Sequence, residues 1–230
     1  MTSRRPAALL LGALLLTTAC TSASGPGSAA SAPAVPTTAA DEPAESPRPP
    51  LAVRALTSAE VQYGWWNWAA GSRAGRSPVA DPDGRWCAER QHEDIWYLAG
   101  TTGGDTVERT CAVPLGLPVL FPLVTIVGEA ADCEAFMDRA GGSATLDGAP
   151  LPVEPLGATR IKLVSVAGNA FGATVTDSDN TWSCGLWVRL EPLTPGNHEL
   201  TLRGESGRPG FSVGVDYHLR AAVPTPTGAV

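Results

Sequence analysis

This chain of 230 residues has no excess of basic residues. Its 23 acidic side chains outnumber its 16 lysines and arginines, which gives a net charge of −7. Duplex nucleic acid is bound by a basic stripe, so the composition excludes that class of partner. After its first twenty residues the chain also lacks any run close to the roughly 18 consecutive apolar residues of a transmembrane helix. We therefore expect no membrane-spanning helix in the folded part.

Familiar catalytic motifs are missing as well. There is no G-x-S-x-G nucleophile elbow, because residues 204–207 read Gly-Glu-Ser-Gly, and there is no Walker loop, G-x-G-x-x-G or H-E-x-x-H sequence. No two cysteines have the C-x-x-C spacing that is typical of a zinc site. The sequence therefore predicts no cofactor and no metal, and it gives little support to an enzyme.

The first twenty residues have the organisation of an export signal. Two arginines precede an apolar run over residues 7–16, and small residues then lead to Cys20. The run Leu-Thr-Thr-Ala-Cys at 16–20 resembles a bacterial lipobox. The resemblance implies that residues 1–19 are a removed signal peptide, that Cys20 carries lipid such as palmitate, and that the protein is anchored at the extracytoplasmic face of the cell membrane. Ordinary cleavage after Ala23, which would secrete the protein, is the alternative.

The segment after the lipobox has the composition of a tether. Of the 30 residues at 21–50, 25 are Ala, Pro, Ser, Thr or Gly, and a single one is a large apolar residue. Such a stretch buries too little surface to offset the entropy of ordering it. We therefore expect residues 20–50 to be disordered, residues 51–223 to form a single domain, and residues 224–230 to be a disordered tail.

A helix is predicted immediately after the tether. Thr57 and Glu60 have the spacing of a capping box, and Gly71 provides a stop. At 100° per residue, one face of this helix collects Val61, Trp65, Trp68 and Ala69. We therefore expect its tryptophans to be anchored in the core.

Two further aromatic residues of this helix lie off the apolar face. Tyr63 and Trp66, together with Trp182, are candidate ligand-binding residues that would form a platform on which a sugar or a peptide stacks. The alternative, which we favour, is that a later loop covers the aromatic residues of the helix.

From residue 86 onward the pattern is one of short strands separated by turns rich in Gly and Pro. Residues 119–127 are almost wholly apolar, as in a central strand buried on both faces, and residues 211–219 alternate. A short helix is expected over 130–140, and the Asp-Gly pair at 147–148 predicts a hairpin turn. Together these features predict a mainly β protein. We expect an antiparallel β-sandwich, immunoglobulin-like or jelly-roll, with an N-terminal Trp-rich helix and one further short helix.

Four cysteines belong to the predicted domain: Cys87, Cys111, Cys133 and Cys184. An exported domain meets an oxidising compartment, so two disulfides are expected, in one of three pairings. We favour Cys87–Cys111, because these residues flank a predicted hairpin of strands 95–99 and 107–113, and this choice leaves Cys133–Cys184. A zinc site is the weaker alternative.

Several short motifs of the predicted domain occur in a fixed order: WWNW at 65–68, WCAERQ at 86–91, IWYLAG at 95–100, RTCAVP at 109–114, LFP at 120–122, LDG at 146–148 and PGNH at 195–198. These motifs resemble those of a group of uncharacterised exported bacterial proteins. The resemblance covers most of residues 60–219. It supports Cys87 and Cys111 as partners and adds no catalytic residue.

The three histidines are the remaining candidates for acid–base chemistry. His92, Glu93 and Asp94 place an imidazole and two carboxylates before a strand, where they are weak catalytic candidates, and a solvated strand start is the favoured interpretation. His198 shares the inward face of its strand, so we expect a core histidine bonded to loop backbone. His218 is expected to pair with charged residues of the preceding strand.

Two functional hypotheses follow. The first is a membrane-tethered, non-catalytic binding module for a protein or glycan of the cell envelope, which the anchor, the tether and the sandwich pattern favour. The alternative is a cell-envelope hydrolase or isomerase that uses the cluster at residues 92–94. Sandwich domains host both classes, so the fold alone does not decide between them.

Overall fold

A computed structural model describes residues 52–172 and 177–223 of the chain. The predicted signal peptide, the lipidation site Cys20, the tether and the tail at 224–230 lie outside the described residues. No helix within the described ranges is long and apolar enough to cross a membrane.

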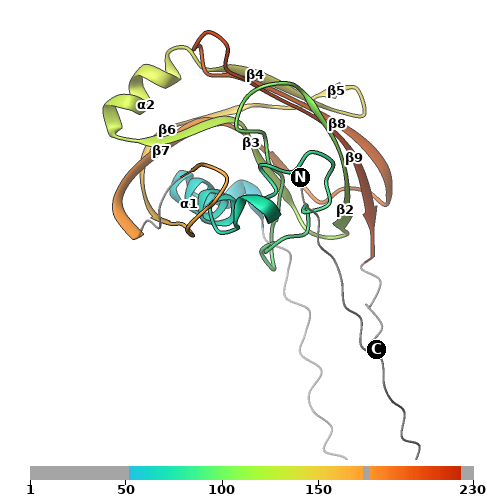
Figure 1. Cartoon of the computed structure of the whole chain (residues 1–230). Coiled ribbons are helices and arrows are strands. Elements are labelled where there is room, and N and C mark those ends of the chain that lie inside the picture. Colours follow the sequence, from blue (N-terminus) through green and yellow to red (C-terminus); the bar gives the residue numbers. More distant parts are fainter. Residues whose placement is uncertain (1–51, 173–176, 224–230) are drawn as a thin grey trace, which may run out of the picture. The chain divides into compact units, whose positions relative to one another are not determined.

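Two β-sheets form the sandwich that the sequence predicts, and the mainly β fold class is confirmed (Figure 1). The first sheet has the order β1-β3-β7-β6 and consists of β1 (Trp96–Tyr97), β3 (Val119–Gly128), β7 (Asp177–Leu190) and β6 (Glu154–Val164). The second has the order β2-β9-β8-β4-β5 and consists of β2 (Val107–Pro114), β9 (Ser212–Ala222), β8 (Gly196–Glu205), β4 (Gly141–Leu146) and β5 (Ala149–Pro150).

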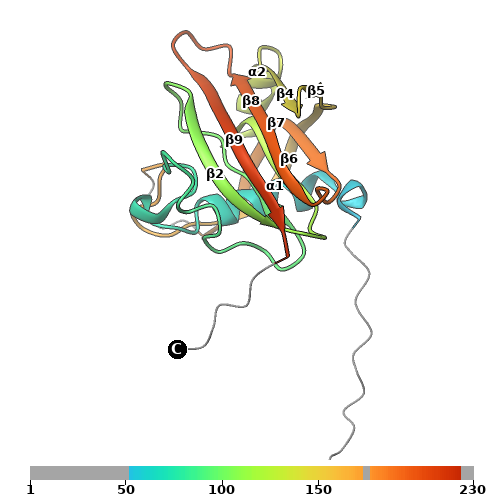
Figure 2. The same cartoon turned by 90° about the vertical axis from the view of Figure 1, so that its right-hand side faces the viewer.

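Most neighbouring strands are antiparallel, as predicted, but two pairs run parallel. These are β1 with β3, and β2 with β9, which lie side by side in Figure 2. Parallel neighbours need a long connection between them, and most of the domain separates β2 from β9 in the chain. The expectation of a purely antiparallel sandwich is therefore wrong at these two pairs.

The predicted Trp-rich helix is α1 (Ser58–Ala69), and its capping box is formed by Thr57 and Glu60 as the sequence indicates. The helix packs on the four-stranded sheet on the side away from the five-stranded sheet (Figure 1). Trp65 and Trp68 are buried there, and Trp65 meets Trp187 of β7 edge to face, with ring centroids 5.9 Å apart. The four-stranded sheet is thus covered on both faces. Two short 3₁₀ helices flank α1: η1 (Val53–Ala55) and η2 (Ala74–Arg76).

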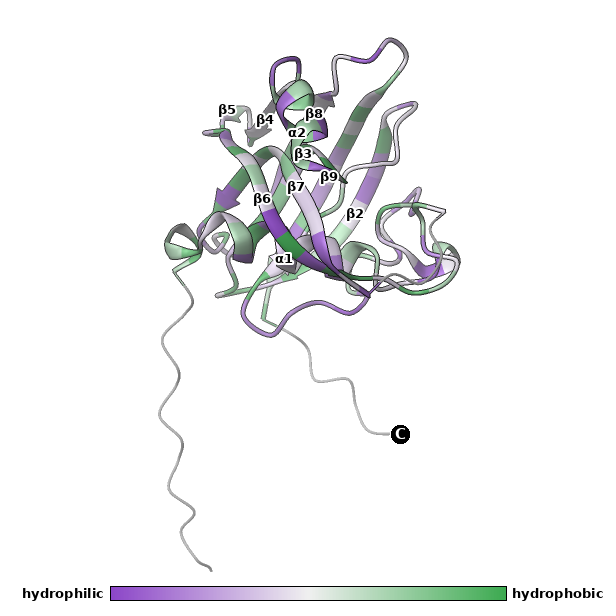
Figure 3. Ribbon diagram, turned by 90° about the vertical axis from the view of Figure 1, so that its left-hand side faces the viewer, coloured by the Kyte–Doolittle hydropathy of each residue, from purple (hydrophilic) through white to green (hydrophobic). Residues whose placement is uncertain are grey.

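The main core lies between the two sheets. Along β9 buried residues alternate with partly or fully exposed ones at most positions, and bands of both hydropathy colours run along this strand in Figure 3. The predicted second helix is α2 (Ala130–Met137), and its Cys133 and Phe136 belong to the inter-sheet core. The predicted Asp-Gly turn is also present, with positive φ at Asp147 and Gly148 joining β4 to β5. Alternation therefore predicted the buried faces correctly in this part of the chain.

The predicted hairpin of strands 95–99 and 107–113 does not form. Residues 96–97 pair with β3 in one sheet, whereas β2 pairs with β9 in the other. Burial explains the difference. Residues 95–99 are buried without alternation and need a sheet covered on both faces, whereas β2 alternates and has one face in solvent.

Both favoured disulfides are present. The Cα atoms of Cys87 and Cys111 are 5.8 Å apart and those of Cys133 and Cys184 are 5.6 Å apart, which are separations that a disulfide spans. The first pairing was predicted from a hairpin that does not exist, so the prediction is confirmed although its reason is wrong. Cys87 instead lies in a loop that covers the edge of β2. Two disulfides in one domain indicate an extracytoplasmic protein.

Candidate functional site

The three aromatic residues predicted to form a binding platform lie at different places. Tyr63 is 47% exposed and borders a shallow groove between α1 and β6. Trp66 is buried, with 5% exposure, and Trp182 is half-buried against the inter-sheet core. The structure therefore does not assemble these side chains into one platform.

The cluster at residues 92–94 sits at the start of β1. His92 and Glu93 are exposed and Asp94 is half-buried. The Asp94 backbone N–H donates to Nδ1 of His92 at 3.1 Å. The three residues do not line the large cavity described below.

His198 is a buried histidine bonded to loop backbone. Its Nε2 lies 2.9 Å from the carbonyl oxygen of Thr194, and its Nδ1 lies 2.7 Å from Oδ2 of Asp147. The hydrogen bond that the Asp147 carboxylate accepts from the imidazole raises the pKa of His198, and the same bond lowers the pKa of Asp147. This pair ties the β4–β5 turn to the turn before β8, which gives it a structural role.

His218 takes part in cross-strand pairing on the solvent face of β8 and β9, as expected. Its Nδ1 lies 2.7 Å from a carboxylate oxygen of Glu199, and this hydrogen bond raises the pKa of His218. Beside it, Arg203 donates to both carboxylate oxygens of Asp216 at 2.8 and 2.9 Å, which lowers the pKa of Asp216. The pairs explain these side chains without a catalytic role.

An apolar cavity of about 410 Å³ lies beside α1. Its volume falls within the range of about 300–1,000 Å³ that is typical of ligand sites. Six consecutive residues of β3, at 122–127, form one wall. Four aromatic side chains contribute to the others: Trp65, Trp66, Phe171 and Phe211. None of the described residues that line this cavity is ionisable.

The polar groups in the cavity walls are largely bonded to the protein itself. Nε1 of Trp66 donates to the hydroxyl of Thr125 at 3.3 Å, and that hydroxyl donates to the carbonyl oxygen of Cys184 at 2.7 Å. Nε1 of Trp65 donates to the carbonyl oxygen of Leu98 at 2.9 Å. A hydrogen-bonding group of a ligand would find few free side-chain partners there, and burying one without a partner costs about 1–3 kcal/mol. The cavity therefore suits an uncharged apolar group.

A loop covers Trp66, as the favoured interpretation of the sequence expected, but that interpretation is wrong for Tyr63, which stays exposed. The rings of Trp66 and Phe171 lie 5.1 Å apart at 49°, and Phe171 itself is 37% exposed. The loop is fixed to the end of α1, because Val166 N–H donates to the Ala70 carbonyl at 3.1 Å and Ala74 N–H to that of Gly168 at 2.8 Å. Trp66 thus forms a wall of the cavity rather than a surface platform.

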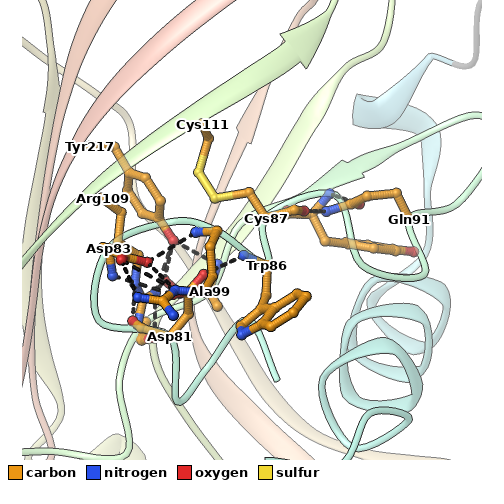
Figure 4. Close-up of a disulfide and its surroundings, with 12 residues drawn as sticks. Asp81, Asp83, Trp86, Cys87, Gln91, Ala99, Arg109, Cys111 and Tyr217 are labelled. Carbon is orange, nitrogen blue, oxygen red and sulfur yellow. Dashed lines mark hydrogen bonds and ion pairs between the residues drawn. A yellow bond between two sulfur atoms is a disulfide. The ribbon is translucent and has the colours of Figure 1, made fainter. Parts of the chain in front are cut away.

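Arg109 forms hydrogen bonds with several segments, two of which reach the cavity wall (Figure 4). Its side chain is buried, with 1% exposure, and donates to the Tyr217 hydroxyl at 3.0 Å and to four backbone carbonyl oxygens at 2.7 to 3.1 Å. These carbonyls belong to Val79, Asp81, Ala99 and Gly100. Val79 and Gly100 line the cavity, so one guanidinium group joins two of its wall segments.

Side-chain amides close both outer edges of the four-stranded sheet. On β1, the amide of Gln91 accepts from Tyr97 N–H at 2.8 Å and donates to the Tyr97 carbonyl at 2.9 Å. On β6, the amide of Asn67 accepts from Val164 N–H at 2.6 Å and donates to the Lys162 carbonyl at 2.9 Å. Each amide takes the place of a neighbouring strand, which protects an edge against uncontrolled pairing.

The edges of the five-stranded sheet are protected in other ways. On β2, Thr110 N–H donates to the carbonyl oxygen of Asp83 at 3.0 Å, so the loop that contains Cys87 covers this edge. On the opposite side, β5 has two residues, and one of them is Pro150. Short edge strands and proline both discourage the addition of a further strand.

Sequence reasoning did not find the cavity, although parts of its wall were recognised. Residues 119–127 were predicted as a central strand that is buried on both faces. In the structure β1 pairs with only the first part of this strand, and residues 122–127 line the cavity. Phe211 was placed on the inward face of its strand, and it is a half-buried cavity residue. A glycine-rich turn at 100–104 between two strands was the available signal for an irregular opening.

Comparisons with known proteins add no relative: no family model, no curated protein and no solved structure matches the chain. Within the described part of the chain, no three His, Cys, Asp or Glu side chains are grouped so that they could hold a metal ion. The cavity beside Trp66 is therefore the site on which a functional argument rests.

Proposed function

We propose that this protein is a non-catalytic binding module that takes an apolar part of a cell-envelope protein into the cavity beside Trp66. The observation that carries the proposal is the lining of that cavity, with four aromatic side chains and no ionisable group among its described residues. Acid–base catalysis needs a titratable group within reach of the substrate. Apolar recognition needs the aromatic and aliphatic surface that is present.

The lining also favours a protein over a glycan as the partner. A sugar presents a hydroxyl on most of its carbons, and each buried hydroxyl requires a hydrogen-bonding partner. The hydroxyl of Thr125 and the indole N–H groups of Trp65 and Trp66 are already bonded within the protein. Aliphatic or aromatic side chains of a protein carry no hydroxyl that would be buried without a partner.

The proposal includes the anchor inferred from the lipobox-like sequence. Lipid on Cys20 would hold the module at the extracytoplasmic face of the cell membrane, and residues 21–50 would separate it from the surface. Replacing Cys20 with Ala should move the protein from the membrane fraction to the soluble fraction. Retention of the Cys20→Ala variant in the membrane fraction would remove this part of the proposal.

The binding function is tested by filling the cavity. Ala170 is half-buried and lines the cavity, whereas Ala167 is exposed in the same loop and does not line it. Ala170→Phe should abolish binding of solubilised envelope proteins to the immobilised full-length protein, and Ala167→Phe should leave it unchanged. Protease treatment of the envelope extract should abolish binding, and glycosidase treatment should not. Equal binding by both variants would contradict the proposal.

A further inference from the structure

The β3 strand loses one of its neighbours part-way along its length. Val119 and Leu120 pair with β1, and the Leu98 N–H donates to the Leu120 carbonyl at 3.1 Å. From Pro122 to Gly128 β3 pairs with β7 on one side, with a register shift at Leu123, and no strand of the described ranges lies on the other side. In such a strand alternate peptide groups point away from the single neighbour. Residues 122–127 of this open edge are also the residues that line the cavity.

Parts of the other edges of the sandwich are closed. Gln91 bonds β1 at Tyr97, Asn67 bonds β6 at Lys162 and Val164, the Asp83 loop bonds β2 at Thr110, and β5 is too short to receive a strand. An open strand edge is a site for unwanted pairing, so its presence beside an aromatic cavity needs an explanation. Addition of a partner strand would give the edge a function.

We propose that the β3 edge from Pro122 to Gly128 receives an extended segment of a partner polypeptide as an additional strand, with alternate partner side chains in the aromatic cavity. This inference rests on the proposed function and names the mode of recognition. Main-chain hydrogen bonds would supply affinity and the cavity would supply specificity, as in other cases of strand addition. A hydrocarbon chain would fill the cavity but would leave the peptide groups of the edge unpaired.

The lining defines the chemistry of the partner segment. Successive side chains of a strand point to opposite faces, so every second partner residue would face Trp66, Phe171 and Phe211. These residues must be apolar, because none of the described wall residues can pair with a charge. Pro122 has no N–H to donate, so the main-chain ladder would begin after it. The expected partner motif is thus an alternation of apolar residues with residues of any kind.

The test uses the full-length protein and a displayed library of random heptapeptides. Selected peptides should have an apolar residue at every second position. Their affinity should fall by about tenfold or more for Ala170→Phe and by less than about twofold for Ala167→Phe. The decisive comparison uses synthetic copies of a selected peptide that are methylated at alternate backbone nitrogens, in one register or the other. Both sets are measured against the unaltered protein, so the outcome does not depend on how a protein variant folds. Methylation in the register that faces β3 should lower affinity about tenfold or more, and methylation in the other register should have little effect.

Four results would overturn strand addition. The first is that no peptide is selected, and the second is that both methylation registers have the same effect. The third is that 1-decanol displaces the peptides and binds with equal affinity, which would assign the cavity to a hydrocarbon. The fourth is self-association that Ala170→Phe abolishes, which would assign the edge to a second copy of the chain. If envelope proteins still bind through the cavity in any of these cases, the proposed function stands and only this mode fails.

Discussion

The side-chain amide of Gln91 pairs with both backbone polar groups of Tyr97, donating to its carbonyl at 2.9 Å and accepting from its N–H at 2.8 Å. The amide thus ends the four-stranded sheet at β1, as a neighbouring strand would. Asn67 does the same for β6 at Lys162 and Val164. Two residues that no strand pattern would single out therefore define where the sheet stops.

Replacing Gln91 with Ala should expose the β1 edge. Three hydrogen bonds are lost, two to Tyr97 and one to the Cys87 carbonyl, and each is worth about 1 kcal/mol, so we expect a loss of about 3 kcal/mol in the free energy of unfolding. The freed edge should also raise self-association at high concentration. Urea unfolding and size-exclusion chromatography measure the two effects. A Gln91→Ala variant that is as stable and as monomeric as the unaltered protein would show that the amide does not close the edge.

Arg109→Lys tests the buried guanidinium group that joins two wall segments of the cavity. An ammonium group cannot reach five acceptors in the planar arrangement that a guanidinium group satisfies. Losing charge-assisted bonds in a buried site should lower the free energy of unfolding by about 3 kcal/mol or more. Arg220→Lys, at an exposed position of β9, is the matched control and should change it by less than about 0.5 kcal/mol. Equal changes in the free energy of unfolding of the two variants would show that the Arg109 hydrogen bonds do not stabilise the fold.

The His198–Asp147 pair makes stability depend on pH. The pKa of His198 is raised in the folded protein, so its contribution is complete below the unfolded value of about 6.5 and disappears as the pH rises through the folded pKa. The pKa of Asp147 is lowered, so its contribution is complete above about 3.9 and disappears as the pH falls through the folded pKa. The pair should therefore stabilise most strongly between about pH 4 and 6.5.

Variants at the two paired histidines check this dependence. His198→Gln should flatten the fall in stability as the pH rises above about 6.5, measured by urea unfolding at several pH values. His218→Gln should have a smaller effect, because His218 and Glu199 are exposed and water and salt screen their interaction. A profile that His198→Gln leaves unchanged would show that the pair does not contribute.

The two disulfides should differ in their effect on the cavity. On the chain-entropy model, removal of Cys87–Cys111 costs about 3.5 kcal/mol and removal of Cys133–Cys184 about 4 kcal/mol. The first ties down the loop whose Val79 and Asp81 carbonyls Arg109 binds, whereas the second joins α2 to β7. Replacing Cys87 and Cys111 by Ser should therefore weaken peptide binding more than replacing Cys133 and Cys184. The opposite order, measured on the folded variants, would contradict the proposed role of this loop.

Local signals predicted much of the fold because they depend on residues close in the sequence. The capping box of Thr57 and Glu60, the Asp147–Gly148 turn and the alternation in β9 all formed as expected. Pairings between distant segments were harder to predict. Residues 95–99 joined β3 because an apolar strand needs cover on both faces, and sequence proximity to residues 107–113 gave the wrong partner.

The candidate site was less predictable than the fold. Trp66 was recognised as an unusual aromatic residue, but whether it faced solvent, a loop or a cavity depended on Phe171, about a hundred residues later in the chain. The open edge of β3 exists because β1 ends at Tyr97, after which Ala99 bonds the Tyr217 hydroxyl and Arg109 instead of β3. Neither relationship leaves a pattern that a sequence shows by itself.

The central claim, that a partner strand adds to β3 beside the cavity, is tested most directly by amide hydrogen exchange in the full-length protein with and without a selected peptide. Amides that face away from β7 between Leu123 and Gly128 should exchange about tenfold or more slowly when the peptide is bound, because they gain hydrogen-bonded partners. Exchange at the β6 edge near Val164, which Asn67 already closes, should not change. Unchanged exchange along β3 with saturating peptide would contradict the account.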